Sequence, residues 1–279
     1  MADLRFSKMH GLGNDFVVFD GRRRAVRLET DQVRAVANRR TGVGCDQLII
    51  LEPARNVAAD VFIRIYNADG GEVFACGNAA RCVAALIMDE RRADEAVIET
   101  AHDLLRARRA EGGMIAVDMG PVRTAWNEIP LAEPRDTLHL GIALGALADP
   151  VAVNVGNPHA VFFVDDAEAV DLGPLGSVLE CHELFPERTN VEAAAVLSPS
   201  TLRVRVWERG VGITPACGSG ACAALVAANL RGLAASAGEV ILDGGTLGIE
   251  RLDDGHVLMT GPVAAVFSGT LDPSLASAS

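Results

Sequence analysis

Two cysteines in the sequence stand where a buried helix is expected to begin. Cys76 and Cys217 are each followed by glycine, a small polar residue and an apolar run. The first N–H groups of a helix and its dipole attract anions and lower the pKa of a thiol at that position. Each cysteine is therefore a candidate acid–base group, and the neighbouring amides of Gly77, Asn78, Gly218 and Ser219 are candidate ligands for a substrate carboxylate.

Two such thiols on opposite sides of one cleft predict a particular reaction. A thiolate removes a proton from one face of a carbon, and a thiol delivers a proton to the opposite face, which inverts the stereocentre. The carbon beside a carboxylate is a weak acid, so negative charge develops in the transition state. Two helix N-termini aimed at the carboxylate stabilise that charge. The chemistry predicted by this pattern requires neither a metal nor a cofactor.

The sequence repeats itself once, which supports the pairing of the two cysteines. Residues 63–67 resemble 204–208, and residues 76–80 resemble 217–221, at one offset of 141 residues. Residues 13–19 resemble 156–162, and Gln47 resembles Asn190, at an offset of 143. The two halves are therefore expected to be copies of one domain.

The same coarse pattern of elements is predicted in each half. A Gly-Asn turn leads into an apolar strand, a second strand follows Gln47 or Asn190, and an alternating strand covers 63–65 or 204–207. Helices are predicted near 79–88 and 220–229, with Asn78 and Ser219 as N-caps. Both helices are apolar almost all round, which is typical of a buried helix.

These elements predict an α/β (α+β) fold of two similar domains, each a curved sheet or barrel around a central helix. The predicted boundaries are 1–118 with 264–279 for the domain of Cys76, and 119–263 for the domain of Cys217.

The composition excludes several classes of function. The chain has 279 residues and a formal net charge of −12, which argues against nucleic-acid binding. No apolar segment is long enough to predict a membrane span or a secretory signal, so a cytoplasmic protein is expected, with its six cysteines as thiols. Lys8 is the single lysine, which disfavours Schiff-base cofactors such as pyridoxal phosphate.

Six ordered blocks resemble diaminopimelate epimerases: residues 9–16, 67–70, 75–78, 156–159, 208–212 and 216–222. The resemblance implies a cofactor-independent epimerase that interconverts LL-2,6-diaminoheptanedioate (diaminopimelate) and its meso isomer, in the pathway to lysine and peptidoglycan. It implies a homodimer with one site between two α/β domains, and a last strand that returns to the first domain. Ala79, where the family more often has glycine, and Ser219, where threonine is common, depart from the pattern.

The resemblance also assigns roles to residues. Cys76 and Cys217 match the acid–base pair, and His159 and Glu208 match residues that support catalysis. The substrate contacts that it implies are Asn14, Gln47, Asn67, Gly77, Asn78, Asn157, Asn190, Glu208, Arg209, Gly218 and Ser219. Arg209 is expected on the distal carboxylate, because a guanidinium binds a carboxylate through two parallel hydrogen bonds.

Other interpretations remain open at this level. A proline or hydroxyproline racemase also uses two thiols, a phenazine-type isomerase uses a carboxylate in the first half, and a binding or thiol-redox module needs no turnover. Cys82 and Cys222 are interpreted as core residues, and Cys45 and Cys181 have no counterpart in the other half. Asp46 adjoins Gln47, but no partner carboxylate is evident in the sequence.

Overall fold

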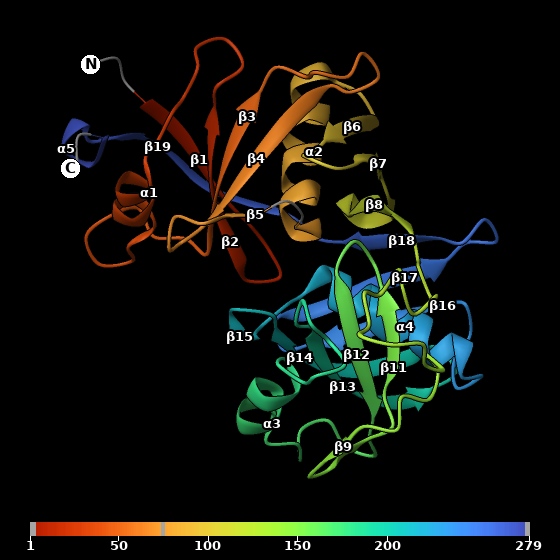
Figure 1. Cartoon of the computed structure of the whole chain (residues 1–279). Coiled ribbons are helices and arrows are strands. Elements are labelled where there is room, and N and C mark those ends of the chain that lie inside the picture. Colours follow the sequence, from red (N-terminus) through yellow and green to blue (C-terminus); the bar gives the residue numbers. More distant parts are fainter. Residues whose placement is uncertain (1–3, 74–75, 277–279) are drawn as a thin grey trace. The chain divides into compact units, whose positions relative to one another are not determined.

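A computed structural model describes residues 4–73 and 76–276, and the chain divides into two compact units (Figure 1). Unit 1 comprises Met1–Val117 and Pro262–Ser279, and unit 2 comprises Asp118–Gly261. These limits lie one to two residues from the boundaries drawn from the sequence. The two units are described separately below.

Unit 1 is built on strands, with two longer helices, α1 and α2, between them in the chain and two short helices further on. Its elements are β1 (Leu4–Gly11), β2 (Asn14–Asp20), α1 (Thr30–Ala37), β3 (Gln47–Glu52), β4 (Val61–Asn67), β5 (Glu72–Val73), α2 (Gly77–Arg91), β6 (Glu95–Glu99), β7 (Leu104–Arg109), the short helix η1 (Glu111–Gly113), β19 (Ala264–Leu271) and α5 (Pro273–Ala276). Strand β8 (Ile115–Pro121) leads from unit 1 into unit 2.

Unit 2 repeats this order of elements after a short hairpin of its own. Its elements are β9 (Ala143–Leu144), β10 (Leu147–Ala148), β11 (Val151–Asn154), β12 (Pro158–Phe163), α3 (Leu172–Leu179), β13 (Asn190–Ser198), β14 (Thr201–Glu208), β15 (Gly212–Thr214), α4 (Gly218–Leu230), β16 (Ala237–Leu242), β17 (Gly245–Arg251) and β18 (His256–Gly261).

Strand pairing confirms the duplication. In unit 1, β2 pairs parallel with β3, β3 antiparallel with β4, β4 parallel with β6, and β6 antiparallel with β7. In unit 2, β12, β13, β14, β16 and β17 pair in the same order and with the same directions. The second strand of each parallel pair begins at the predicted residue, Gln47 or Asn190, so both side chains lie at the same edge of their sheets.

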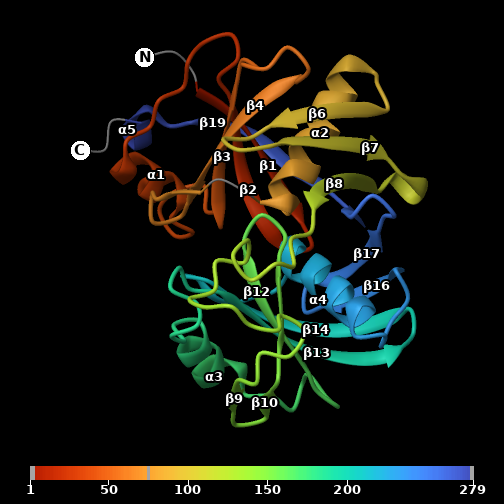
Figure 2. The same ribbon diagram turned by 45° about the vertical axis from the view of Figure 1, so that its right-hand side comes forward.

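The two predicted central helices are present, and both are longer than expected. In α2 the residues from Gly77 to Ala85 are buried, and in α4 the residues from Gly220 to Ala228 are buried. Figure 2 shows α4, in blue, among the strands of unit 2. The small side chains of both helices, mostly alanine, let strands approach closely on several sides. Among the described residues, no helix has the length and apolar character needed to span a bilayer.

The predicted N-caps, Asn78 and Ser219, are wrong by two residues. Helices α2 and α4 begin at Gly77 and Gly218, and the N-cap residues are the cysteines themselves, both in an extended backbone conformation. The reason is local: Cys217 Sγ accepts a hydrogen bond from the Gly220 amide at 3.3 Å, so the sulfur takes the place of a hydroxyl or carboxamide cap.

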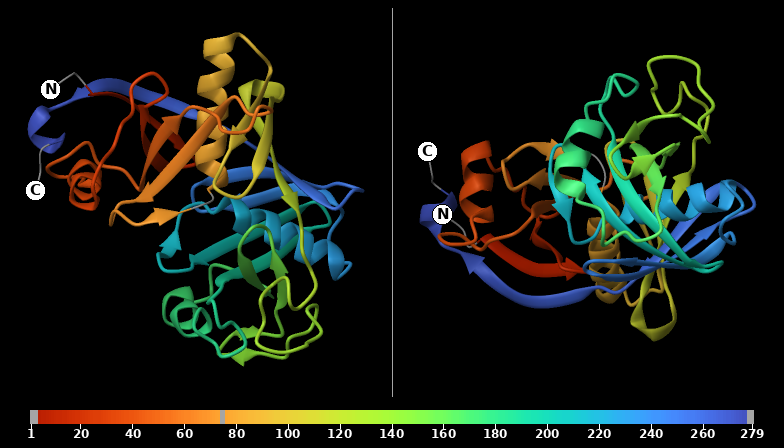
Figure 3. Two further views of the ribbon diagram at one scale, coloured as in Figure 1. Left: turned by 45° about the horizontal axis from the view of Figure 1, so that its top comes forward. Right: turned by 90° about the horizontal axis from the view of Figure 1, so that it is seen from below.

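In each unit a further helix packs on the sheet, α1 in unit 1 and α3 in unit 2. In unit 1, Val33 and Val36 of α1 are buried in one cluster with Val17, Phe19 and Leu48. Figure 3 shows α1, in red, and α2, in gold, on different sides of these strands. Because strand side chains alternate between faces, both faces of the sheet are apolar. In unit 2, α3 packs on β13 and β14, with Leu172 and Leu179 in the cluster.

The last strand of the chain belongs to unit 1, as the family resemblance implied. β19 pairs antiparallel with β1 from Leu4↔Leu271 to His10↔Ala264 (Figure 1). Strand β1 therefore has β2 on one side and β19 on the other.

Two glycines of α3 provide a matched test of this packing. A Cβ on Gly176 would lie 2.6 Å from Trp207 Cγ, whereas a Cβ on Gly173 would approach only Asp171 Oδ1, at 3.9 Å. The Trp207 indole is held by a 2.7 Å hydrogen bond from Nε1 to Glu180 Oε2, so it cannot move freely. We expect Gly176→Ala to lower the free energy of unfolding by about 1–3 kcal/mol.

Denaturant titrations of the variants measure this effect. Gly173→Ala is the control, and it should be neutral or stabilising by up to about 1 kcal/mol, because alanine favours helix. Equal effects of the two substitutions would contradict this account of α3.

Candidate active site

Cys76 lies at the N-cap of α2, beside the side chain of Asn14 at the start of β2. Asn14 Oδ1 is 3.8 Å from Cys76 Sγ, and it accepts a hydrogen bond from Asn78 Nδ2 at 3.2 Å. Gly77 is the first residue of α2, and Asn78 is only 2% exposed. Three of the predicted residues of this half, Asn14, Gly77 and Asn78, therefore lie together around the Cys76 thiol.

The orientation of the Asn14 carboxamide is fixed by Asp46. Asn14 Nδ2 donates to Asp46 Oδ2 at 3.1 Å, and a carboxylate can only accept. The Asn14 oxygen must therefore face Cys76 and Asn78. A thiol at Cys76 can donate its hydrogen to this oxygen.

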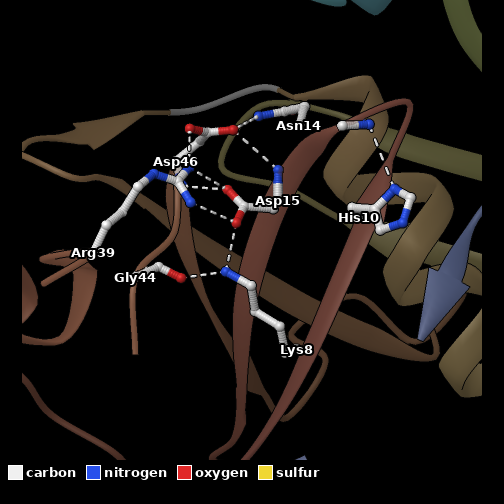
Figure 4. Close-up of polar contacts among 8 residues, drawn as sticks. Lys8, His10, Asn14, Asp15, Arg39, Gly44 and Asp46 are labelled. Atoms are coloured by element: carbon white, nitrogen blue, oxygen red, sulfur yellow. Dashed lines mark hydrogen bonds and ion pairs between the residues drawn. The ribbon is translucent and has the colours of Figure 1, made fainter. Parts of the chain in front are cut away.

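Asp46 is one of four charged side chains that form a cluster and hold it in place (Figure 4). Arg39 donates to both carboxylate oxygens of Asp15, at 2.9 and 2.7 Å, and to Asp46 Oδ1 at 2.6 Å. Lys8 Nζ lies 2.6 Å from Asp15 Oδ2 and also donates to the Gly44 carbonyl. Two positive and two negative charges balance, so the cluster positions Asn14 without adding net charge beside Cys76.

Gln47 and Asn67 form a second polar pair in unit 1. They face each other across β3 and β4, and Gln47 Nε2 donates to Asn67 Oδ1 at 2.9 Å. Gln47 Oε1 is buried and makes no hydrogen bond to any residue that the structure describes. An ammonium group of a ligand would satisfy this acceptor.

Cys217 is the counterpart of Cys76 in unit 2 and is 6% exposed. Its sulfur accepts from the Gly220 amide and lies 3.5 Å from Ser219 Oγ. Burial and the neighbouring Glu208 carboxylate raise the pKa of Cys217, and the Ser219 and Gly220 hydrogen bonds only partly offset this. The expectation that a helix start gives an acidic thiol is therefore wrong for Cys217 in this structure, because desolvation outweighs the helix amides.

Glu208, at the end of β14, lies beside Cys217 and is largely enclosed. Burial raises the pKa of Glu208, although the hydroxyl of Thr214 donates to Oε1 and opposes the shift. Glu208 and Cys217 are thus neighbours whose pKa values are both raised by burial.

The remaining predicted residues of unit 2 lie on or next to the strands β12, β13 and β14. Strands β12 and β13 run parallel. His159 pairs in register with Asn190. His159 Nε2 is 2.8 Å from Asn157 Oδ1, and Asn190 Nδ2 donates to the Pro158 carbonyl at 2.8 Å. The Arg209 amide donates to Asn190 Oδ1 at 2.9 Å, and its exposed guanidinium donates to the Glu187 carbonyl.

The other four cysteines differ in their exposure. Cys45, Cys82 and Cys222 are buried and Cys181 is exposed. Burial raises the pKa of Cys45 and of Cys82 to about 12, so both stay protonated as core residues.

Sequence reasoning missed three charged residues behind the site. Asp15 is the partner carboxylate that Asp46 lacked in the sequence analysis, and each accepts the backbone amide of the other. Arg39 joins the two. Glu192, next to His159, is fully buried. A lone glutamate within the apolar strand 190–195 was a signal that could have found it.

Comparison with solved structures places the fold in a class shared by several isomerases. A hydroxyproline epimerase from Agrobacterium vitis matches with a TM-score of 0.69 at 17% identity, covering 98% of this chain and 94% of that one. A phenazine biosynthesis protein from Bacillus anthracis matches with a TM-score of 0.68 at 15% identity, covering 97% and 99%. The molecule thus has the duplicated two-domain fold of this class.

Sequence comparison narrows the class to one family. The model of the diaminopimelate epimerase family matches residues 6–125 and 151–266. Diaminopimelate epimerases from Rhodospirillum centenum and Acidiphilium cryptum are 59% and 52% identical to this chain; each alignment covers 97% of it, and 93% and 97% of those proteins. The chain belongs to the diaminopimelate epimerase family.

The charged cluster in Figure 4 predicts a pH-dependent stability. Partial burial of Asp15 disfavours its charge, but hydrogen bonds from Arg39, Lys8 and the Asp46 amide outweigh this and hold the pKa of Asp15 well below its ordinary value. The folded-state pKa is therefore below that of the unfolded chain. The resulting stabilisation is present above about pH 4 and is lost as the pH falls toward the folded-state pKa.

Thermal unfolding of Asp15→Asn from pH 7 to pH 2 tests this. The wild type should be more stable at neutral pH, and the difference should shrink below about pH 4. Asp31→Asn is the control, because Asp31 forms an exposed pair with Arg34 that contributes little. A difference between wild type and Asp15→Asn that does not change with pH would contradict the account.

Proposed function

We propose that the chain interconverts LL-2,6-diaminopimelate and meso-diaminopimelate by proton transfer at the α-carbon. Membership of the diaminopimelate epimerase family supports the substrate. The observation that carries the chemistry is the repeated half-site, in which each unit sets a cysteine at the N-cap of a buried helix. Asn14 lies beside Cys76, and Ser219 lies beside Cys217. The same arrangement occurs twice because inversion needs one proton acceptor and one proton donor.

In this proposal the two thiols act on opposite faces of the same substrate carbon. In one direction, Cys76 as thiolate removes the α-hydrogen as a proton, and the electron pair stays on the α-carbon. Cys217 then gives its thiol proton to the opposite face and is left as thiolate. The reverse direction exchanges the roles. The raised pKa of Cys217 supports its part as proton donor.

The charge that develops beside the substrate carboxylate is stabilised by the two helix starts. The amides of Gly77 and Asn78, and those of Gly218 and Ser219, are the first N–H groups of their helices, the end at which the helix dipole attracts an anion. Such donors, fixed before the reaction, contribute transition-state stabilisation without reorganisation.

The polar side chains at the strand starts fit a long substrate with two amino-acid ends. Gln47 Oε1 and Asn67 offer acceptors for an ammonium group, and Asn14 lies beside the Cys76 thiol. Asn157, Asn190 and Arg209 are proposed to hold the distal end, with the Arg209 guanidinium on the distal carboxylate. Glu208, beside Cys217, is proposed to orient or polarise the reacting groups.

Proton NMR in heavy water tests the substrate and the reaction together. Fully reduced protein should remove one Cα proton signal of LL-diaminopimelate while the meso isomer appears. If that substrate remains unchanged and trans-4-hydroxy-L-proline loses its Cα proton instead, the substrate proposal is wrong and a racemase of the proline type takes its place.

Single-cysteine variants in the same assay test the two-thiol mechanism. Cys76→Ala and Cys217→Ala should each lower the rate of epimerisation by at least about 10²- to 10⁴-fold, the contribution typical of one acid–base group. Cys181→Ala is the matched control, because Cys181 is an exposed thiol. Normal epimerisation by either of the first two variants would refute the mechanism.

We also propose that the chain forms a homodimer. Val266 and Phe267 of β19 are 55% and 50% exposed, and two neighbouring apolar side chains on one strand would be covered by a second copy. Light scattering should give twice the mass of one chain, and Phe267→Glu should reduce it to that of a monomer. A wild-type mass of one chain would exclude the dimer.

A further inference from the structure

Glu192 is a buried carboxylate that the proposed reaction does not use. It is the third residue of β13, and its side chain is 0% exposed between the apolar residues Val191 and Ala193. Removing a carboxylate from water is unfavourable by several kcal/mol unless hydrogen bonds compensate for it. The position of this group in the core therefore calls for a specific partner.

That partner is His159 on the neighbouring parallel strand β12. Glu192 Oε1 lies 2.6 Å from His159 Nδ1, and the His159 side chain is also 0% exposed. The other ring nitrogen, Nε2, lies 2.8 Å from Asn157 Oδ1. Glu192, His159 and Asn157 thus form one hydrogen-bonded chain, which runs from the core to the half-buried Asn157 at the site.

The orientation of the Asn157 carboxamide sets the number of protons in the chain. Where Asn157 Oδ1 faces the ring at 2.8 Å, His159 Nε2 carries hydrogen and donates, because a carboxamide oxygen only accepts hydrogen bonds. The 2.6 Å contact between Nδ1 and Oε1 then needs a proton of its own, since two lone pairs at that distance would repel. The pair of Glu192 and His159 therefore carries no net charge, whichever of the two holds the second proton.

The proton count and the orientation of Asn157 are therefore coupled, so that a group which sets one also sets the other. With Nε2–H donating to Oδ1, the Asn157 NH₂ group is directed away from the imidazole and can donate to a bound ligand. If His159 carried its only proton on Nδ1, Nε2 would accept, and the Asn157 carboxamide would turn over. A carboxylate of the substrate would then meet an oxygen rather than an NH₂ donor.

We propose that Glu192 is a positioning residue of the epimerase, which acts through His159 to hold the Asn157 carboxamide with its NH₂ group toward the distal end of the substrate. This rests on the proposed function, because it assigns Asn157 to that substrate. It gives His159, with both ring nitrogens engaged, a positioning role in place of direct contact with the reacting atoms.

The start of α4 is built around the same carboxylate. A Cβ on Gly220 would lie 3.0 Å from Glu192 Oε1 and 3.3 Å from Cys217 Cβ. The absence of a side chain at Gly220 thus leaves room for Glu192 directly beneath the helix turn that carries Cys217. The positioning chain and the Cys217 thiol are therefore adjacent.

A double-mutant cycle tests whether Glu192 acts through Asn157. Glu192→Met keeps the length of the buried side chain but cannot hydrogen-bond to His159. We expect kcat/KM for LL-diaminopimelate to fall on the order of 10- to 100-fold, mostly through KM, as for a misplaced binding group. In an Asn157→Ala background the same substitution should change kcat/KM less than about threefold, because the group that it positions is gone.

A merely structural role for Glu192 gives a different result, namely the same loss of kcat/KM in both backgrounds, and that result would overturn the proposal. Asp118→Asn is the matched control, because Asp118 also pairs with a histidine of unit 2, with its Oδ1 3.0 Å from His256 Nδ1. This variant should keep the wild-type kcat/KM.

The protonation of His159 is measured on the unmodified protein, so this test does not depend on any variant folding. Long-range ¹H–¹⁵N NMR of histidine-labelled protein should show Nε2 protonated, with the signals assigned by their loss in His159→Gln. A neutral ring protonated only at Nδ1 would overturn the proposal. If the wild type does not turn over diaminopimelate, the proposed function fails, but this measurement still decides whether the chain holds Asn157 as described.

Discussion

The N-terminal end of an enclosed helix carries amide groups for which the helix itself has no acceptor, and both units are organised around that constraint. At the surface, water would accept these hydrogen bonds. In α4 the Cys217 sulfur accepts the third amide of the helix. The first amides of both helices are the donors proposed to bind a substrate carboxylate. A buried helix whose cap is a cysteine thus supplies an acid–base group and an anion site from one turn of backbone.

The Asn14 carboxamide beside Cys76 has a defined orientation, because a charged group behind it decides which end donates. Asp46 accepts from Asn14 and so turns the Asn14 oxygen toward Cys76. The proposed role of Glu192 and His159 is the same for Asn157. In unit 1 the negative charges of Asp15 and Asp46 are balanced by those of Arg39 and Lys8. A net charge would shift the pKa of the neighbouring thiol as well as hold the amide.

Much of this fold follows from patterns that a sequence displays directly. The repeat at one offset, the alternating strands before each cysteine and the apolar helices after it predicted two similar units, and strand pairing confirmed them. The N-caps were misplaced at Asn78 and Ser219 because propensity favours a hydroxyl or carboxamide over sulfur. The pairing of Asp46 with Asp15 could not be predicted, since it depends on the register of β2 and β3 and on Arg39, a residue from a different segment.

The pKa of Cys217 was harder to predict than the position of this residue at the start of a helix. The sequence indicated that a helix start would acidify Cys217, yet burial and Glu208 act more strongly in the opposite direction. Burial of this kind results from how strands close around α4. It is a property of the packed unit, and no short segment of sequence encodes it.

The return of β19 to unit 1 sets an order for synthesis on the ribosome. Unit 2 is one continuous segment, Asp118–Gly261, so its sheet can be completed as soon as that segment has emerged. Unit 1 begins the chain, but β1 gains its partner β19 only after residue 271 has been made. The first part of the protein to be translated is therefore the last to be finished, and a nascent or truncated chain exposes one edge of β1 to other unpaired strands.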